Sequence, residues 1–431
     1  MDISSKEFEF SKIKHPSQLP ILFFTEMWER FSYYGMRALL VLYLVKNLKY
    51  TESLAGSIYG AYTGLVYFTP LLGGFIADRY LGYKKTILVG GVLMMFGHFS
   101  LAIESQESFF LGLILLILGN GFFKPNISTL IGYLYKDKPE LKDSGFTIFY
   151  MGINIGGMIG PLLCGYVGEM YSWHYGFGLA GIGMFLGLLV FSNGYKNLPE
   201  KELVINKSIS EESLTVIEKN HIKVIFILSI FTMFFWFAFE QAGSSMNLFA
   251  DKFIDRRLFS FEIPASVFQA LNGFLILVLA PLFSLVWQNF HKKNIKIYTS
   301  IQFLFAFVFL LIGFLVLVQG SMELKKSPKL SIYYILLPYF FHTLGELCIS
   351  PVGLAMVSKL APLRFTSMMM GFWFLSNAIS HYLAGFVSGK MNSFENLSDF
   401  FLIFVYTSII CIIILSLLYK KIHFMMYQKI G

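Results

Sequence analysis

Apolar stretches of about 20 residues recur along the whole 431-residue chain, and they constrain its fold more than any other feature. A helix of that length crosses the hydrocarbon core of a bilayer. Hydrophobic residues make up 56% of the chain and charged residues only 14%, against about 25% charged in soluble domains. The pattern predicts an all-α membrane protein with twelve transmembrane helices, near residues 20–45, 53–77, 83–103, 109–134, 144–170, 173–195, 222–250, 262–288, 296–319, 331–358, 366–390 and 398–420.

The longest polar interruption, residues 196–221, separates the first six spans from the last six. We therefore expect an N-terminal six-helix bundle over 1–195, a cytoplasmic linker over 196–221 and a C-terminal six-helix bundle over 222–431. Pro70 and Pro281 occupy matching places in the two halves, each ahead of a basic loop. This weak repeat is typical of transporters whose two halves rock about a site at the membrane midplane.

The net charge of +8 follows the loops and does not indicate nucleic-acid binding. With both termini placed in the cytoplasm, most of the 34 Lys and Arg fall on the cytoplasmic side, as the positive-inside rule requires. Residues 1–19 are polar, so no cleavable signal is expected. We predict a multi-pass protein of a plasma membrane, namely a bacterial inner membrane, embedded in the lipid bilayer with both termini cytoplasmic.

Several ionisable side chains lie inside the predicted spans, where each costs about 2.5–3.5 kcal/mol at the bilayer centre on insertion scales. These residues are Glu26, Glu29, Arg30, Arg37, Lys124, Glu240 and Glu346. We expect all of them to face one interior cavity, which indicates transport. Four acids would then face three bases, and keeping one carboxyl protonated would be the cheaper arrangement. That excess acid suggests proton coupling.

The polar residues of the first span fall at helical spacing on one stripe, from Glu26 through Glu29, Arg30, Tyr33 and Tyr34 to Arg37. Such a stripe faces a wet cavity or other charges. The alternative is a buried lattice of ion pairs that only holds helices together.

Three further charges stand alone in their spans. Lys124 precedes Pro125, which leaves a backbone carbonyl free, and it could bind a carboxylate or take part in a proton circuit; the alternative is snorkelling to an interface. Glu240 and Glu346 are each the single acid of an apolar helix, where low dielectric favours the neutral carboxyl. We interpret both as candidate proton carriers, against the alternative of acids that end helices at the interface.

Motifs for other chemistry are absent from the sequence. There is no G-x-x-x-x-G-K-[ST] loop and no His-Glu-x-x-His spacing, so we expect no enzyme, no cofactor and no metal site. Three scattered cysteines form neither a disulfide framework nor a metal motif. His98, His342 and His381 are expected to be ordinary core residues.

The stretch Glu26-x-x-Glu29-Arg30-Phe31, followed by Tyr33-Tyr34-Gly35, resembles the first-helix signature of the proton-dependent oligopeptide transporters of the major facilitator superfamily. The resemblance covers nearly the whole chain. Further matching motifs are Gly73-Gly74 with Asp78-Arg79 and Gly82, Lys124-Pro125-Asn126, Phe149-Tyr150 with Asn154, Trp236-x-x-x-Glu240-Gln241, Asn272, Gly345-Glu346-Leu347 with Ser350-Pro351, and Trp373 with Asn377.

The resemblance implies two six-helix bundles and proton-coupled symport of di- and tripeptides by alternating access, with the protein working as a monomer. Arg37 and Lys124 would hold the peptide carboxylate; Glu346, with Asn154 and Asn272, would hold the amino end. Glu240 would exchange between Arg37 and the proton. The residues that would couple proton movement to Lys124 are Glu26, Glu29 and Arg30. The aromatic residues that would line side-chain pockets are Tyr33, Tyr34, Tyr67, Trp236 and Trp373.

The chain departs from relatives in two places. Many bacterial members insert two helices where this chain has only the linker 196–221. Mammalian members carry a functional histidine in the second span, where the nearest rings here are Tyr59 and Tyr62, so proton handling would rest on carboxylates. Two alternatives stay open: a proton-coupled carrier of nitrate or another small solute on the same scaffold, and a peptide sensor that does not transport.

Overall fold

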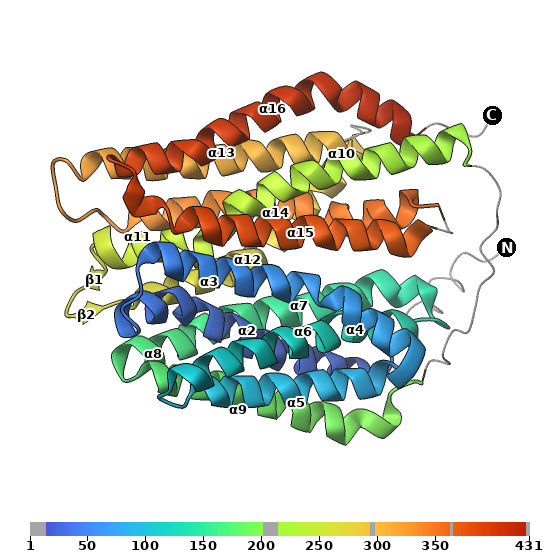
Figure 1. Ribbon diagram of the computed structural model, residues 1–431. Helices are drawn as coiled ribbons and strands as arrows, with labels where there is room; N and C mark the ends of the chain where they lie inside the picture. The colour runs from blue at the N-terminus through green and yellow to red at the C-terminus, as the bar shows by residue number, and fades with distance from the viewer. Residues whose placement is uncertain (1–13, 201–213, 294–297, 363–364, 428–431) are drawn as a thin grey trace.

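The computed structural model describes residues 14–200, 214–293, 298–362 and 365–427. Within these residues the chain is helical apart from short connections and one two-stranded hairpin. The long helices run side by side, with the first half of the chain in the lower part of Figure 1 and the second half in the upper part. We call the end that carries the hairpin the hairpin end, and the opposite end, where α2 begins and α16 finishes, the terminal end (Figure 1).

The described part of the first half contains six long helical segments. Two of the breaks within them fall at proline: α4 starts at Pro70, where the ring suits the first turn of a helix, and the end of α7 passes into a wider π-helical turn at Pro161. Their bounds are α2 Leu19–Leu42 with a π-helical turn at Tyr43–Asn47, α3 Glu52–Phe68 with α4 Pro70–Ile76 and a π-helical turn at Ala77–Leu81, α5 Tyr83–Leu101, α6 Gln106–Leu134, α7 Lys142–Gly160 with a π-helical turn at Pro161–Gly165 and α8 Tyr166–Met170, and α9 Trp173–Gly194.

The described part of the second half contains another six long segments and the hairpin. α10 starts with a capping box, in which Thr215 and Glu218 satisfy each other's free backbone N–H groups. The bounds are α10 Val216–Phe239 with a 3-10 turn at Glu240–Gly243 and α11 Ser245–Phe253, strands β1 Arg257–Leu258 and β2 Phe261–Glu262, a 3-10 turn at Ala265–Gln269 with α12 Ala270–Lys292, α13 Thr299–Glu323, α14 Tyr333–Leu360, α15 Thr366–Ser388 and α16 Leu397–Tyr427.

These segments overlap the twelve predicted spans, with ends that differ by a few residues. Eight of the helices in the described residues are long and apolar enough to cross a membrane by length and composition. The segment that contains α2 is not among those eight, and it is the one that carries Glu26, Glu29, Arg30 and Arg37. The middle of the predicted linker, residues 201–213, lies outside the described residues. The domain boundaries at 195 and 222 therefore stay a prediction.

Glycine allows several helices to approach closely. A Cβ added at Gly156 or Gly160 of α7 would collide with backbone oxygen atoms of α2, so these two small residues let the two helices pack closely. Across the two halves, α3 and α15 meet in the same way. A Cβ at Gly60 would lie 2.5 Å from the carbonyl oxygen of Tyr382, and one at Gly56 would lie 2.5 Å from that of Gly385.

The two halves are tied together at the hairpin end. Lys46, after α2, contacts Asp251 of α11 at 2.9 Å, and Glu52 at the start of α3 forms an ion pair with Lys252. The carboxylate of Glu169 in α8 accepts hydrogen bonds from the backbone N–H of Ser266, at 2.7 Å, and from its hydroxyl. These contacts hold this end of the molecule closed.

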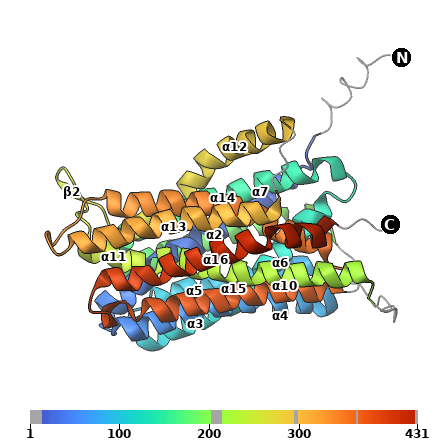
Figure 2. The ribbon, with the colours of Figure 1, turned by 90° about the horizontal axis from the view of Figure 1, so that it is seen from above.

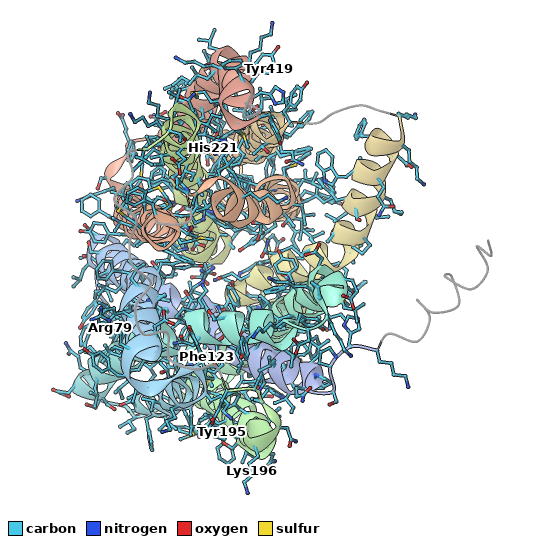
Figure 3. All side chains as sticks on the ribbon, turned by 90° about the vertical axis from the view of Figure 1, so that its right-hand side faces the viewer. Arg79, Phe123, Tyr195, Lys196, His221 and Tyr419 are labelled. Atoms are coloured by element: carbon cyan, nitrogen blue, oxygen red, sulfur yellow. The ribbon has the colours of Figure 1, made fainter. Side chains whose placement is uncertain are left out.

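The terminal end is different in shape. The second half of α12 projects away from the other helices (Figure 2), and most of its side chains from residue 281 onward are exposed. Basic side chains lie at this end, including the exposed Arg79 and Lys196 labelled in Figure 3. The structure is thus closed at the hairpin end, while α12 leaves the bundle at the terminal end.

Candidate substrate-binding and proton-coupling site

The first group of intramembrane charges lies between α2 and α6. Arg30 Nε is 2.9 Å from Glu26 Oε1 and 2.5 Å from Glu29 Oε2, and all three side chains are at most 4% exposed. Asn120 of α6 donates a hydrogen bond to Glu29 at 3.3 Å. Two carboxylates thus share one guanidinium in a site without bulk water. The attraction of each carboxylate to the guanidinium is strong there because the local dielectric is low. We call Glu26, Glu29, Arg30 and Lys124 the acid–base cluster.

Lys124 is the α6 member of this cluster. Its Nζ lies 4.1 Å from the centre of the ring of Tyr67 in α3, which is a cation–π contact. In the part of the chain that the structure describes, no carboxylate lies within ion-pair distance of this ammonium. Lys124 is therefore a half-buried cation held near two acids and an aromatic ring, in a position to respond if either acid changes its charge.

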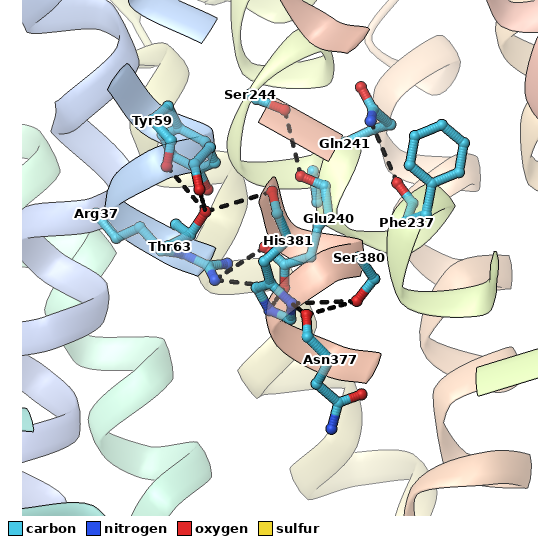
Figure 4. Close-up of polar contacts among 12 residues, drawn as sticks. Arg37, Tyr59, Thr63, Phe237, Glu240, Gln241, Ser244, Asn377, Ser380 and His381 are labelled. Atoms are coloured by element: carbon cyan, nitrogen blue, oxygen red, sulfur yellow. Dashed lines mark hydrogen bonds and ion pairs between the residues drawn. The ribbon is translucent and has the colours of Figure 1, made fainter. Parts of the chain in front are cut away.

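The second group joins the two halves of the molecule. Arg37 of α2 donates to Glu240 at the end of α10, with Nη1 3.1 Å from Oε2 and 3.4 Å from Oε1. On the other side of the same carboxylate, Nε2 of His381 in α15 is 3.2 Å from Oε1. Figure 4 shows these three side chains pointing toward one another. Glu240 is thus flanked by a guanidinium and an imidazole, each from a different half of the chain.

The third group is an amide and carboxyl pair in the second half. Asn272 of α12 donates to Glu346 of α14 at 2.7 Å and to the hydroxyl of Thr343 at 3.2 Å. Glu346 is 9% exposed, and no basic residue among those described lies within ion-pair distance of it. This carboxyl is the acid of the set that lacks a cation partner in this conformation.

A cavity of about 110 Å³ lies between the halves and connects the second and third groups. Arg37 lines it from the first half and Glu346 from the second. Asn154, whose amide donates to the Tyr150 carbonyl at 2.8 Å, lines it from α7. The other lining residues are Tyr34, Tyr150, Ile153, Gly157, Pro161, Phe239, Ala242, Gln269, Asn272, Gly273 and Tyr339. The cavity therefore presents a cation and an anion from opposite halves, with amides beside the anion.

One expectation from the sequence is corrected by this geometry. The seven intramembrane charges do not face one cavity: they divide into the acid–base cluster, the Arg37–Glu240 pair and Glu346. Glu240 is the single acid of its helix and meets Arg37 of α2, as the resemblance implied, and the structure adds a contact from His381 of α15. A sequence pattern on one helix cannot show the division into groups or the His381 contact, since each depends on how different helices pack.

The predicted aromatic residues are dispersed around the site. Tyr34 lines the cavity, and the Tyr33 ring lies between the guanidinium groups of Arg30 and Arg37, 5.5 and 5.9 Å from their Cζ atoms. Tyr67 contacts Lys124 and His381. Trp236 packs on Phe235 and Phe239, and Trp373 is buried against Gly353. Their roles in binding side chains stay predictions.

His381 is the residue whose place sequence reasoning missed. It was expected to be an ordinary core histidine, yet the structure sets it against Glu240. Its presence inside an otherwise apolar span was the one available signal. His98 and His342 are buried, and the three cysteines are buried and free. Among the described residues no group of three or more His, Cys, Asp or Glu could hold a metal ion.

Comparison with known proteins accounts for this arrangement. The model of the POT family matches residues 84–224 and 201–403. The chain belongs to the POT family. It is 33% identical to the peptide transporter YePEPT of Yersinia enterocolitica, with 97% of this chain and 96% of that protein covered. It is 35% identical to the uncharacterized transporter YclF of Bacillus subtilis, over 87% of this chain and 88% of the relative.

Solved structures of the family have the same fold. A peptide transporter POT in complex with sulfate superposes with a TM-score of 0.88 at 29% identity, with 99% of this chain and 100% of that one covered. A POT family transporter in complex with 5-aminolevulinic acid gives a TM-score of 0.87 at 27% identity, covering 95% and 97%. The resemblance seen in the sequence is confirmed, and this family member is a multi-pass membrane protein with the major facilitator fold.

Proposed function

We propose that this protein is a proton-coupled symporter of di- and tripeptides that works by alternating access. One observation carries the proposal: Arg37 and Glu346 line the same cavity from opposite halves of the molecule. A zwitterionic peptide needs a cation for its carboxylate and an anion for its amino end. Bound between these two residues, it would bridge the halves and draw them together, which is a physical route from one conformation to the other.

In this proposal the amino end binds Glu346, with Asn272 and Asn154 as neighbouring amides. The carboxylate binds Arg37. Lys124 was predicted either to hold the carboxylate or to serve the proton circuit, and its place in the acid–base cluster rather than on the cavity wall supports the proton circuit. Of the five predicted aromatic residues, Tyr34 is the one that lines this cavity.

Proton coupling rests on the pairing of Arg37 with Glu240. While the pair is closed, the guanidinium is occupied at 3.1 Å and is unavailable to a ligand. A proton arriving at this site weakens the pair and frees Arg37 for the peptide carboxylate. Glu26, Glu29 and Arg30 adjust the charge beside Lys124 in the same cycle. Binding of proton and peptide would thereby favour each other, as reciprocal linkage requires.

The conformation seen here fits one stage of that cycle. Ion pairs and the Glu169–Ser266 contact close the hairpin end, and α12 leaves the bundle at the terminal end. We place both termini in the cytoplasm of a bacterial inner membrane, so this is the state that faces inward. The protein would work as a monomer, without a cofactor and without enzymatic activity.

A carrier of another small solute is the second candidate, because a POT family relative has been solved with 5-aminolevulinic acid. A nitrate carrier would need the cations of the site but not Glu346 with its two amides. A sensor that binds peptide without moving it is the third candidate.

Uptake by the purified protein in liposomes distinguishes these candidate functions. A labelled dipeptide should accumulate inside when the external pH is lower than the internal pH, and the accumulation should vanish when a protonophore removes the gradient. Binding without accumulation would favour a sensor. Accumulation that is indifferent to the pH gradient would remove proton coupling from the proposal.

A further inference from the structure

The imidazole of His381 lies buried in the middle of α15 and contacts two other elements. It is 2% exposed. Its ring packs at a tilt against Tyr67 of α3 with 4.0 Å between centroids, and its Nε2 faces Glu240 at the end of α10. The same Glu240 carboxylate also contacts Arg37 of α2.

The hydrogen bonds of the ring determine where its protons are. Nδ1 is 2.8 Å from the carbonyl oxygen of Asn377, and because a carbonyl can only accept, Nδ1 carries a hydrogen. Nε2 has no hydrogen bond among the described residues and lies 3.2 Å from Oε1 of Glu240. A neutral ring would then point its lone pair at a carboxylate oxygen, and two acceptors so close would repel each other. One proton on the Glu240–His381 pair removes that repulsion.

We propose that His381 carries the transported proton at Nε2, acting with Glu240, which stays ionised between His381 and Arg37. This inference rests on the proposed proton coupling and adds a residue to it. The proton enters from water on one side of the membrane, binds Nε2, and returns to water on the other side. A charged imidazole beside Glu240 competes with Arg37 for the same carboxylate, so loading the proton loosens the Arg37–Glu240 pair without neutralising Glu240.

The groups facing His381 from the other packed elements agree with this assignment. The Tyr67 ring contacts both His381 and Nζ of Lys124. A charge on His381 therefore acts electrostatically on the acid–base cluster through this shared ring. On α14 three titratable side chains have other contacts: Tyr339 donates to the Ala242 carbonyl, Glu346 accepts from Asn272, and His342 packs against Phe314. Glu240 is therefore the anion that stabilises a protonated His381.

The test is His381→Gln, which keeps an amide donor near Glu240 but cannot take up a proton. With one proton per peptide, a gradient of one pH unit supports about tenfold accumulation. We expect His381→Gln to bring accumulation toward unity while counterflow of labelled against unlabelled dipeptide continues. His342→Gln is the matched control: a buried histidine of the same half, without a carboxylate among its described contacts, whose loss should leave accumulation as in the unsubstituted protein.

A second measurement guards against a variant that merely disturbs the fold. Potentiometric titration of the purified protein between pH 8 and pH 5 should show about one proton fewer bound by His381→Gln than by the unsubstituted protein, because the proposal places one transported proton on this ring. An equal proton count in the two proteins would overturn the assignment, even if transport were lost. So would accumulation by His381→Gln equal to that of the unsubstituted protein. If the unsubstituted protein itself fails to accumulate peptide, the proposed function fails instead, and the two failures are distinct.

Discussion

Glu52, the first residue of α3, forms an ion pair with Lys252 near the end of α11. The pair crosses from one half of the molecule to the other at the hairpin end, beside the Lys46–Asp251 contact. Both pairs are partly exposed to water, so each contributes modestly, on the order of 0.2–1 kcal/mol. Weak contacts suit a closure that must open once in every transport cycle, because strong ones would trap one state.

The hairpin-end pairs should therefore control how often this end opens. Replacing Glu52 and Lys46 together by Gln should shift the equilibrium toward the open state by about 1 kcal/mol, a factor of about five. The measurement is maleimide labelling of an introduced Ala265→Cys, a position that is fully buried at this end. The native cysteines Cys164, Cys348 and Cys411 are buried and supply a low background.

The charge-reversed pair is the control for this opening. Glu52→Lys combined with Lys252→Glu should label more slowly than either single reversal, since the pair is restored with opposite polarity. Equal labelling in all of these proteins would mean that the ion pairs do not govern closure.

The ligand should be a zwitterion about the length of a dipeptide. Di- and tripeptides should compete with labelled dipeptide for uptake, because they span the distance between a cation and an anion on opposite walls. Free amino acids and nitrate should not compete. The readout is inhibition of uptake in liposomes at a fixed pH gradient, and efficient competition by nitrate would contradict the assignment of Glu346 to a peptide amino group.

Lys124→Ala should abolish proton-driven uptake while the protein still inserts and folds. The substitution removes the second positive charge near Glu26 and Glu29, which are already paired with Arg30, and so unbalances the acid–base cluster. Lys85→Ala, which removes an exposed lysine at the terminal end, is the control and should transport normally. Near-normal driven uptake by Lys124→Ala would remove this lysine from the mechanism.

Glu240→Gln should lose accumulation against a gradient and keep peptide exchange. The substitution removes the anion that contacts both Arg37 and His381. The transported proton then has no stable binding site, while Arg37 stays free for the peptide. Driven uptake and counterflow are measured in the same liposomes. If this variant concentrates peptide as the unsubstituted protein does, the proton is carried elsewhere, and Glu26 and Glu29 become the first candidates.

Gly60→Ala should destabilise the protein by about 1–3 kcal/mol, because the added methyl group has no room against the Tyr382 carbonyl and Gly385. Gly74→Ala provides the comparison, since a Cβ at Gly74 meets nothing within 4 Å. Thermal unfolding in detergent measures both. A melting temperature for Gly60→Ala equal to that of Gly74→Ala would show that α3 and α15 can separate slightly at no cost.

Much of the fold could be predicted because bilayer physics acts on short stretches of sequence. A run of about 20 apolar residues needs no distant partner to be a spanning helix, since its backbone hydrogen bonds are internal. The twelve predicted spans overlap helices for this reason. The same physics singled out Glu26, Arg37, Lys124 and Glu346, because a charge inside a span is costly unless it has a use.

The grouping of those charges could not be predicted from the residues alone. The resemblance implied that Glu240 meets Arg37, which is 203 positions away in the chain, but nothing indicated that Glu240 would meet His381, on another helix of the second half. Which residues meet depends on the rotation and closeness of packed helices, which glycines such as Gly60 and Gly156 permit. The sequence by itself determined which helices span the membrane and which side chains are expensive to bury. Only the tertiary structure decided that Glu240 faces both Arg37 and His381, because contacts between distant segments form when helices pack and leave no periodic trace in any one of them.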